Sequence, residues 1–174
     1  VLDKVNEAAE RREKLSQRQA KPVHGVLVAG LDNCLVKFSR CCTPIPGDDI
    51  VGFITRGQGV SIHRTDCPNY MSRRNIAEDA GRWINVSWAD EITDSYTTTV
   101  MVSSKERRGL VMDIATVLNA INAKVRSLNA RDTDDGNALV SVSLEVKSLE
   151  ELRGIMNRLA AVAGVSEVTR NGGR

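Results

Sequence analysis

The chain has 174 residues, of which 41% are hydrophobic, 26% charged and 3% aromatic, and its formal net charge is +2. This length suffices for two small domains but not for two large ones. So small a charge does not by itself predict nucleic-acid binding, scarce aromatics leave few platforms for stacking on bases, and no apolar run reaches the roughly 20 residues of a membrane span.

The first segment, residues 1–22, is charged and alanine-containing, with apolar residues at helical spacing, and predicts an N-terminal helix that Pro22 ends. Such a charged start is not a signal peptide, and free thiols in a chain without one favour a reducing, cytoplasmic setting. The next segment, 23–38, has two short apolar runs separated by Gly30, Asp32 and Asn33, which predicts a hairpin. Cys34 lies in the second run and is expected to be a small buried hydrophobe.

Residues 39–90 combine turn chemistry with short apolar strands. PIPGDD, residues 44–49, is a rigid turn, and the runs 50–55 and 59–64 are expected to pair across RGQG. A short helix is expected near Pro68, with Asp66 or Asn69 as its cap, followed by a strand over 82–88. Residues 23–90 therefore predict a small, mostly-β module with one short helix.

Residues 95–174 follow a different pattern. Strand-like runs begin near residues 96, 124, 138 and 164, and apolar stripes at helical spacing cover 109–123 and 148–162. Ser148 and Glu151 form a capping-box pattern at the second helix. The order βαββαβ predicts a ferredoxin-like sheet with both helices on one face, so the fold class of the chain is α+β.

Three of the four cysteines and one of the two histidines fall within 27 residues: Cys41, Cys42, His63 and Cys67. Three thiols and an imidazole form a tetrahedral zinc ligand set, and a site closed by four protein ligands is structural. Adjacent side chains on a strand point to opposite faces, so Cys41 and Cys42 share an ion only if Pro44 and Pro46 turn the chain there. A metal-free, reduced packing of the thiols is the alternative. A catalytic cysteine nucleophile beside His63 is a second and weaker alternative, because the sequence offers no oxyanion donor and no third catalytic residue.

The cysteine-rich window resembles the module near the C-terminus of long Rel/SpoT-family proteins, the bifunctional synthetase/hydrolases of (p)ppGpp. The residues that carry this resemblance are Cys41, Cys42, Pro44, Pro46, Gly47, Asp48, Ile50, Gly52, Thr55, Gly59, His63 and Cys67. Residues 95–174 resemble the ACT domain that follows this module. The resemblance reaches over about 23–174 and leaves out the family's catalytic domains, so it implies a regulatory fragment that is not an enzyme by itself.

The resemblance implies a role in the stringent response: docking on a stalled ribosome with uncharged tRNA, contacting ribosomal RNA, and signalling to the catalytic domains upstream. Residues 33–76 hold six basic and three acidic residues, a balance of +3, whereas 91–174 hold eleven of each. RNA contacts are therefore expected on the cysteine module. The alternative is an ordinary solvated surface whose basic side chains contact no RNA. The candidates are Arg40, Arg56, Arg64, Arg73 and Arg74.

The runner-up function is amino-acid sensing that sets the balance of synthesis and hydrolysis. ACT domains often bind amino acids at the loop between the first strand and first helix, commonly between two paired copies, and some Rel proteins are credited with branched-chain ligands. That loop is KERRGL here, where Gly109 and the helix N-terminus suit a carboxylate. A solvated turn without ligand is the alternative. The candidates are Arg107, Arg108, Gly109 and Leu110, with Lys124 and Val125 opposite.

Overall fold

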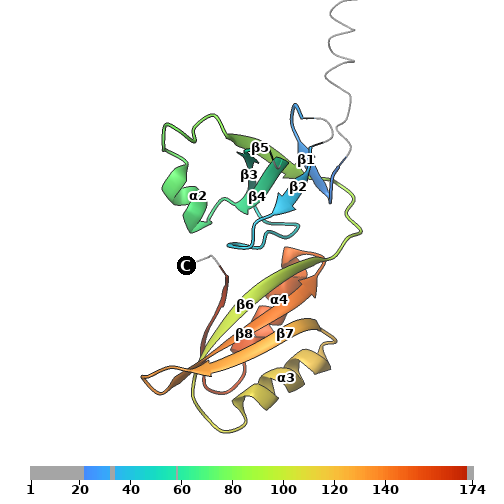
Figure 1. Ribbon diagram of the computed structural model, residues 1–174. Helices are drawn as coiled ribbons and strands as arrows, with labels where there is room; N and C mark the ends of the chain where they lie inside the picture. The colour runs from blue at the N-terminus through green and yellow to red at the C-terminus, as the bar shows by residue number, and fades with distance from the viewer. Residues whose placement is uncertain (1–21, 32–33, 58, 172–174) are drawn as a thin grey trace, which may run out of the picture.

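The computed structural model describes residues 22–31, 34–57 and 59–171. These residues form two β-sheets, which Figure 1 shows one above the other with the helix α2 beside the upper sheet and α3 and α4 with the lower one. The α+β class predicted from the sequence is confirmed. The helix predicted over 1–22 lies, up to residue 21, outside the described residues.

The first sheet contains five strands: β1 (Val26–Val28), β2 (Val36–Phe38), β3 (Ile50–Thr55), β4 (Gly59–Arg64) and β5 (Trp83–Trp88). Their order is β1-β5-β3-β4-β2, with β3 and β4 forming the predicted antiparallel hairpin. The helix α2 (Pro68–Arg73) follows β4 and has no buried residue. Its N-cap is Cys67, without a side-chain hydrogen bond, so neither Asp66 nor Asn69 caps it.

The hairpin predicted over 23–38 is wrong. The strand β1 pairs antiparallel with β5, and β2 pairs parallel with β4 at the opposite edge of the same sheet. Val26 and Val36 still pack in one buried cluster. Two strands of three residues gain few hydrogen bonds from each other, whereas each gains a longer partner and a buried face at a sheet edge.

The second sheet and its helices have the predicted βαββαβ order. The elements are β6 (Tyr96–Lys105), α3 (Leu110–Ala120), β7 (Lys124–Asp132), β8 (Asn137–Val146), α4 (Leu149–Ala160) and β9 (Val165–Arg170). All pairings are antiparallel, in the order β7-β8-β6-β9, and both helices cover one face. Ser148 accepts a hydrogen bond from the Glu151 amide, which confirms the predicted cap, while the Glu151 carboxylate reaches back to the amide of Lys147.

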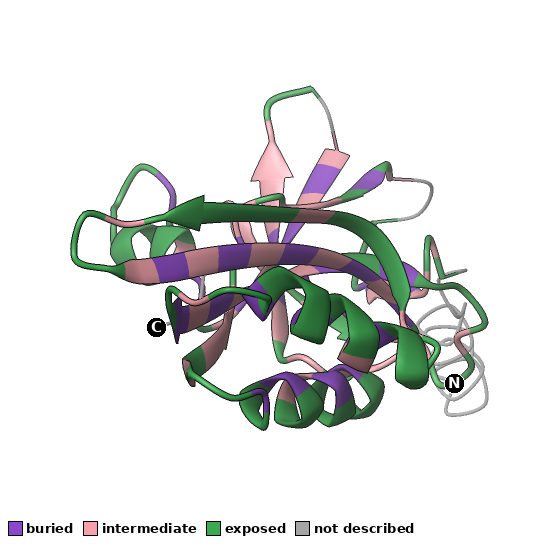
Figure 2. Ribbon diagram, turned by 90° about the horizontal axis from the view of Figure 1, so that it is seen from below, coloured by how far each residue is buried: buried purple, intermediate pink, exposed green. Residues whose placement is uncertain are grey.

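Burial follows the strand period. Every second residue of β6 and β8 is buried, whereas the edge strand β7 has no buried residue, as Figure 2 shows by its green colour. The core of the second sheet includes one residue from the first module: Ile45, which is 0% exposed.

The two modules share an interface. The first module contributes the end of β2, the segment after it and the end of β5; the second contributes the start of β6, the start of α4 and the end of β9. Phe38 and Trp88 stack with ring centroids 5.8 Å apart, and each meets Tyr96 edge to face. Arg170 and Asp48 form an ion pair at 2.6 Å, with both side chains more than nine-tenths buried. We call this interface the seam; its residues are Phe38, Thr43, Ile45, Pro46, Asp48, Trp88, Tyr96, Thr98, Leu149 and Arg170.

Candidate metal centre

Three separate segments bring the four predicted ligands together. Cys41 and Cys42 lie in a turn after β2, His63 lies on β4, and Cys67 stands at the start of α2. The Thr43 amide donates to the Ser39 carbonyl at 2.9 Å and closes that turn. The bend that lets adjacent cysteines face one point therefore precedes the prolines that the sequence suggested for it.

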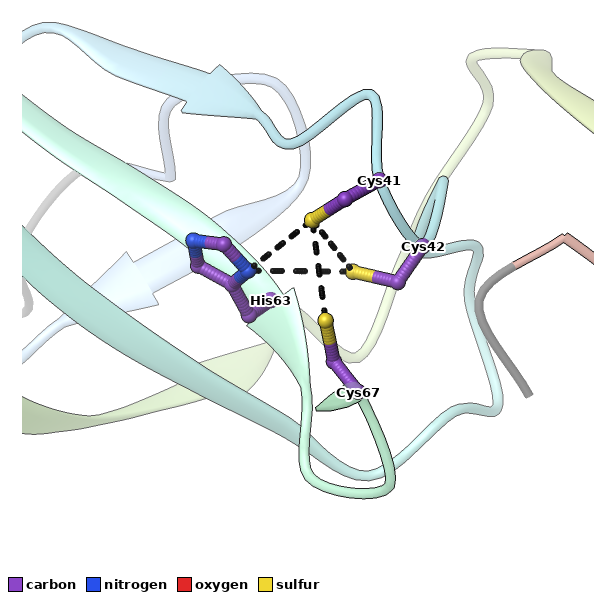
Figure 3. Close-up of side chains that lie close together, drawn as sticks. All are labelled: Cys41, Cys42, His63 and Cys67. Carbon is purple, nitrogen blue, oxygen red and sulfur yellow. Dashed lines mark hydrogen bonds between the residues drawn. The ribbon is translucent and has the colours of Figure 1, made fainter. Parts of the chain in front are cut away.

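The four side chains point toward one another (Figure 3), and all their ligand atoms lie within 4.8 Å of one another. The Cys41 sulfur lies 3.9 Å from that of Cys42, 3.6 Å from that of Cys67 and 3.5 Å from His63 Nδ1. Zn–S bonds of about 2.3 Å and Zn–N bonds of about 2.0 Å in a tetrahedron place two sulfurs about 3.8 Å apart and sulfur and nitrogen about 3.5 Å apart. The three distances from the Cys41 sulfur therefore match the edges of a tetrahedral site, and the cluster could hold a metal ion.

Burial disfavours the charged forms of two of the four ligands, Cys42 and His63. It raises the pKa of Cys42, which is 0% exposed, and the neighbouring thiols Cys41 and Cys67 raise it further. Burial also lowers the pKa of His63, which favours the neutral imidazole that metals bind. A divalent ion bound by these residues would displace thiol protons, because the thiolate is the form of cysteine that binds a metal.

Arg64 lies next to the cluster and forms hydrogen bonds with Cys42. Its amide donates to the Cys42 sulfur at 3.4 Å, its guanidinium donates to the Cys42 carbonyl, and the guanidinium also pairs with Asp66. Trp83 meets the His63 ring edge to face at 5.7 Å, so aromatic packing fixes the imidazole as well. Cys34 lies outside the cluster and is only partly buried, with its sulfur 3.9 Å from the Leu31 carbonyl oxygen.

The predicted RNA-binding arginines differ in exposure. Arg64 is 6% exposed and its guanidinium is engaged within the module, so it cannot reach a phosphate without rearrangement. Arg73 is exposed but pairs with Asp79 at 3.3 Å. Arg40, Arg56 and Arg74 are exposed and lie on three different segments. The sequence count treated all six basic residues alike, because local spacing does not reveal which guanidinium is buried.

The loop KERRGL lines a cleft of about 330 Å³ at the N-terminus of α3. Gly109 adopts a φ of 81° there, and Arg107 pairs with Asp113 at 2.6 Å, while Leu110 is buried. The other wall is the end of β7, which sequence reasoning missed: Ala130, Arg131 and Asp132. The available signal was the predicted βαββαβ order, in which β7 runs in the same direction as β6 and therefore ends near the loop that follows β6.

Lys124 and Val125 do not line this cleft. They start β7, about 26 Å from Asp132 at the rise of an extended strand, and Lys124 pairs with Glu145 at 3.0 Å. Within one copy the structure therefore separates them from the loop. At the cleft, desolvation and the neighbouring Asp132 carboxyl raise the pKa of Glu106, so two acids stand together at that end of β7.

The fold and the cysteine cluster define a chain of two domains, a cysteine-containing β module followed by a ferredoxin-like α+β domain, and comparison with known proteins identifies the family. A RelA/SpoT RIS domain matches residues 26–89 and an ACT domain matches 93–170. The GTP pyrophosphokinase of Photobacterium angustum is 36% identical over 98% of this chain and 22% of its own length, and that of Escherichia coli K12 is 34% identical over 88% and 21%. The crystal structure of the ACT domain from GTP pyrophosphokinase of Chlorobium tepidum is similar at a TM-score of 0.40 and 21% identity, over 44% of this chain and 99% of that one.

The chain belongs to the RelA/SpoT family and corresponds to its C-terminal region, as the sequence resemblance predicted. It spans about one fifth of the length of the relatives it matches, and neither matched domain is a catalytic one. Within the part of the chain that the structure describes, no helix is long and apolar enough to cross a membrane.

Proposed function

We propose that this chain is the part of a cytoplasmic (p)ppGpp synthetase/hydrolase that docks on a stalled ribosome with uncharged tRNA and signals to the catalytic domains of the same protein. The observation that carries the proposal is the pair of matched domains, RIS then ACT, in relatives named GTP pyrophosphokinase. The chain itself should neither make nor hydrolyse (p)ppGpp. Turnover of (p)ppGpp that persists in the purified chain and changes when the chain is mutated would contradict this.

Contact with ribosomal RNA would use exposed basic side chains of the cysteine module. Arg56 and Arg74 are exposed and free of ion pairs within the described residues, so their side chains can reach phosphates. Each lost phosphate contact should lower the salt slope of binding by about 0.7 to 0.9.

The test is co-sedimentation with ribosomes at two salt concentrations. The variant Arg56→Ala/Arg74→Ala should bind more weakly and with a shallower salt dependence. Arg153→Ala/Arg158→Ala, two exposed changes on α4, is the matched control and should bind like the wild type. Loss of binding in the control alone would mean that the ACT domain makes the main contact.

We also propose that Cys41, Cys42, His63 and Cys67 hold zinc as a structural ion. The support is the sulfur and nitrogen spacing of the cluster. Elemental analysis should find one zinc per chain in wild type and in Cys34→Ser, and none retained in Cys67→Ser. Equal loss in both variants would contradict this ligand set.

The second candidate function, sensing of a branched-chain amino acid by paired ACT domains, has one structural observation in its favour. The exposed edge strand β7 carries Lys124 and Arg126 at one end and Asp132, beside Glu106, at the other. Antiparallel pairing of two β7 strands about Leu128 sets Lys124 against Asp132 of the second copy and would bring Lys124 and Val125 to the other copy's KERRGL loop.

Two measurements test this candidate. Sedimentation of the whole chain should show a dimer that Lys124→Glu weakens and that Lys124→Asp combined with Asp132→Lys restores. Calorimetry with valine and isoleucine should show heat that depends on Arg108, a cleft residue without an ion pair in the described part of the chain. A monomer at high concentration that binds neither amino acid would contradict the sensor.

A further inference from the structure

One short loop belongs to both the candidate metal centre and the core of the ACT domain. Cys42 supplies a sulfur to the cluster, and Ile45, three residues later, is fully buried in the hydrophobic cluster beneath the second sheet. Pro46 accepts a hydrogen bond from the Leu149 amide at the start of α4, with an N···O distance of 2.8 Å. Only two residues separate Cys42 from Ile45, and Pro44 is one of them, so few backbone dihedrals are available to absorb a shift of Cys42.

One of the two residues between Cys42 and Ile45 is held in an unusual conformation. Thr43 has a φ of 43°, in the left-handed region that a β-branched residue rarely adopts. Its side-chain oxygen lies 2.9 Å from that of Thr98 on β6, and its carbonyl accepts from the Arg170 guanidinium at 2.9 Å. Both partners belong to the ACT domain, so docking of that domain maintains this backbone conformation.

Arg170 ties the two ends of the loop together. One guanidinium nitrogen donates to the Thr43 carbonyl, and the other pairs with Asp48 at 2.6 Å. The second carboxylate oxygen of Asp48 accepts from the Ile45 amide at 2.8 Å. The Arg170 side chain is 8% exposed and that of Asp48 is 7% exposed, so the ion pair is largely shielded from water. Such a buried pair forms only when the loop holds both groups in the right geometry.

We infer that metal binding at the cysteine cluster and docking of the ACT domain are thermodynamically coupled through the loop 42–48. A bound ion fixes the Cys42 sulfur among four ligands and thereby favours the loop conformation that Arg170, Thr98 and Leu149 recognise. Linkage makes the effect reciprocal: a docked ACT domain raises metal affinity, and removal of the ion loosens the domain. The inference rests on the proposed zinc site, and it assigns the site a regulatory output.

The first experiment measures amide hydrogen exchange by NMR on the whole chain, after treatment with a chelator and after addition of one equivalent of zinc, with metal content measured on the same samples. The Leu149 amide reports the seam, because its acceptor is Pro46. The Leu152 amide, which donates to the Ser148 carbonyl at 3.1 Å within α4, is the internal control. Zinc should slow exchange at Leu149 at least about fivefold and change Leu152 less than about twofold.

The second experiment measures zinc affinity by competition with a chromophoric chelator. Arg170→Met leaves every ligand in place but removes the contacts to Thr43 and Asp48, so its zinc Kd should rise at least about fivefold. Arg158→Met, an exposed change on α4, should stay within about twofold of wild type. If Arg170→Met does not fold, the Leu149 measurement on wild type decides.

The outcomes separate the two proposals. The coupling is overturned if the chain binds one zinc but zinc does not change the exchange rate of the Leu149 amide and Arg170→Met does not change the zinc affinity. The metal site would then still stand. Equal slowing of Leu149 and Leu152 signals general stabilisation and also overturns the coupling. A chain that takes up no zinc overturns both.

Discussion

Ile45 gives the sharpest test of how the two modules depend on each other. The residue lies outside the matched ACT domain, 93–170, yet it is 0% exposed in that domain's core. Ile45→Ala removes three carbon groups, which at about 0.8 kcal/mol each amounts to about 2.4 kcal/mol of lost transfer free energy. The cavity left behind adds to this, so the free energy of unfolding should fall by about 3 kcal/mol.

Equilibrium denaturation in urea, followed by circular dichroism, measures the effect. Ile76→Ala is the matched control, because Ile76 is 42% exposed and the same change should cost less than about 1 kcal/mol. The loss in Ile45→Ala should appear in the transition that melts α3 and α4, although the mutated residue precedes both. Equal midpoints for the two variants would refute the assignment of Ile45 to a shared core.

Three further changes test local features of the fold. A serine hydroxyl and two basic side chains lower the pKa of Glu145 from its ordinary value of 4.5 to about 2. The ionised carboxylate therefore contributes stability above pH 4.5, and this contribution is lost as the pH falls toward 2. Urea midpoints of Glu145→Gln should lack that part of the pH dependence. Ser148→Ala should cost about 1 kcal/mol by removing the α4 cap, and an unchanged midpoint would contradict the cap. Gly52→Ala places a methyl group within 3.0 Å of three side chains and should destabilise the fold by about 1–3 kcal/mol. Gly154→Ala, on α4 with open space around it, should instead stabilise the fold by about 0.5–1 kcal/mol. Thermal melts in which Gly52→Ala is the more stable variant would contradict this packing.

The ACT half could be predicted from the sequence because its signals are local. Alternation along 138–147 encodes one buried face of β8, and the Ser148–Glu151 spacing encodes the start of α4. Each of these signals depends only on the geometry of a single strand or helix. The hairpin over 23–38 failed because the same apolar runs can pair with any strand that offers them a buried face, and three-residue strands carry little register information.

The sequence by itself determined the donor set of the candidate metal centre, the order of the ACT elements and the family resemblance. Only the tertiary structure decided that the turn before Pro44 aims Cys41 and Cys42 at one point, that Arg64 is buried, and that Ile45 packs in the core of the other module. The physical reason is that ligand identity and periodicity are properties of neighbouring residues. Burial of a charge or of an apolar side chain depends instead on residues far along the chain, which only the folded structure brings into contact.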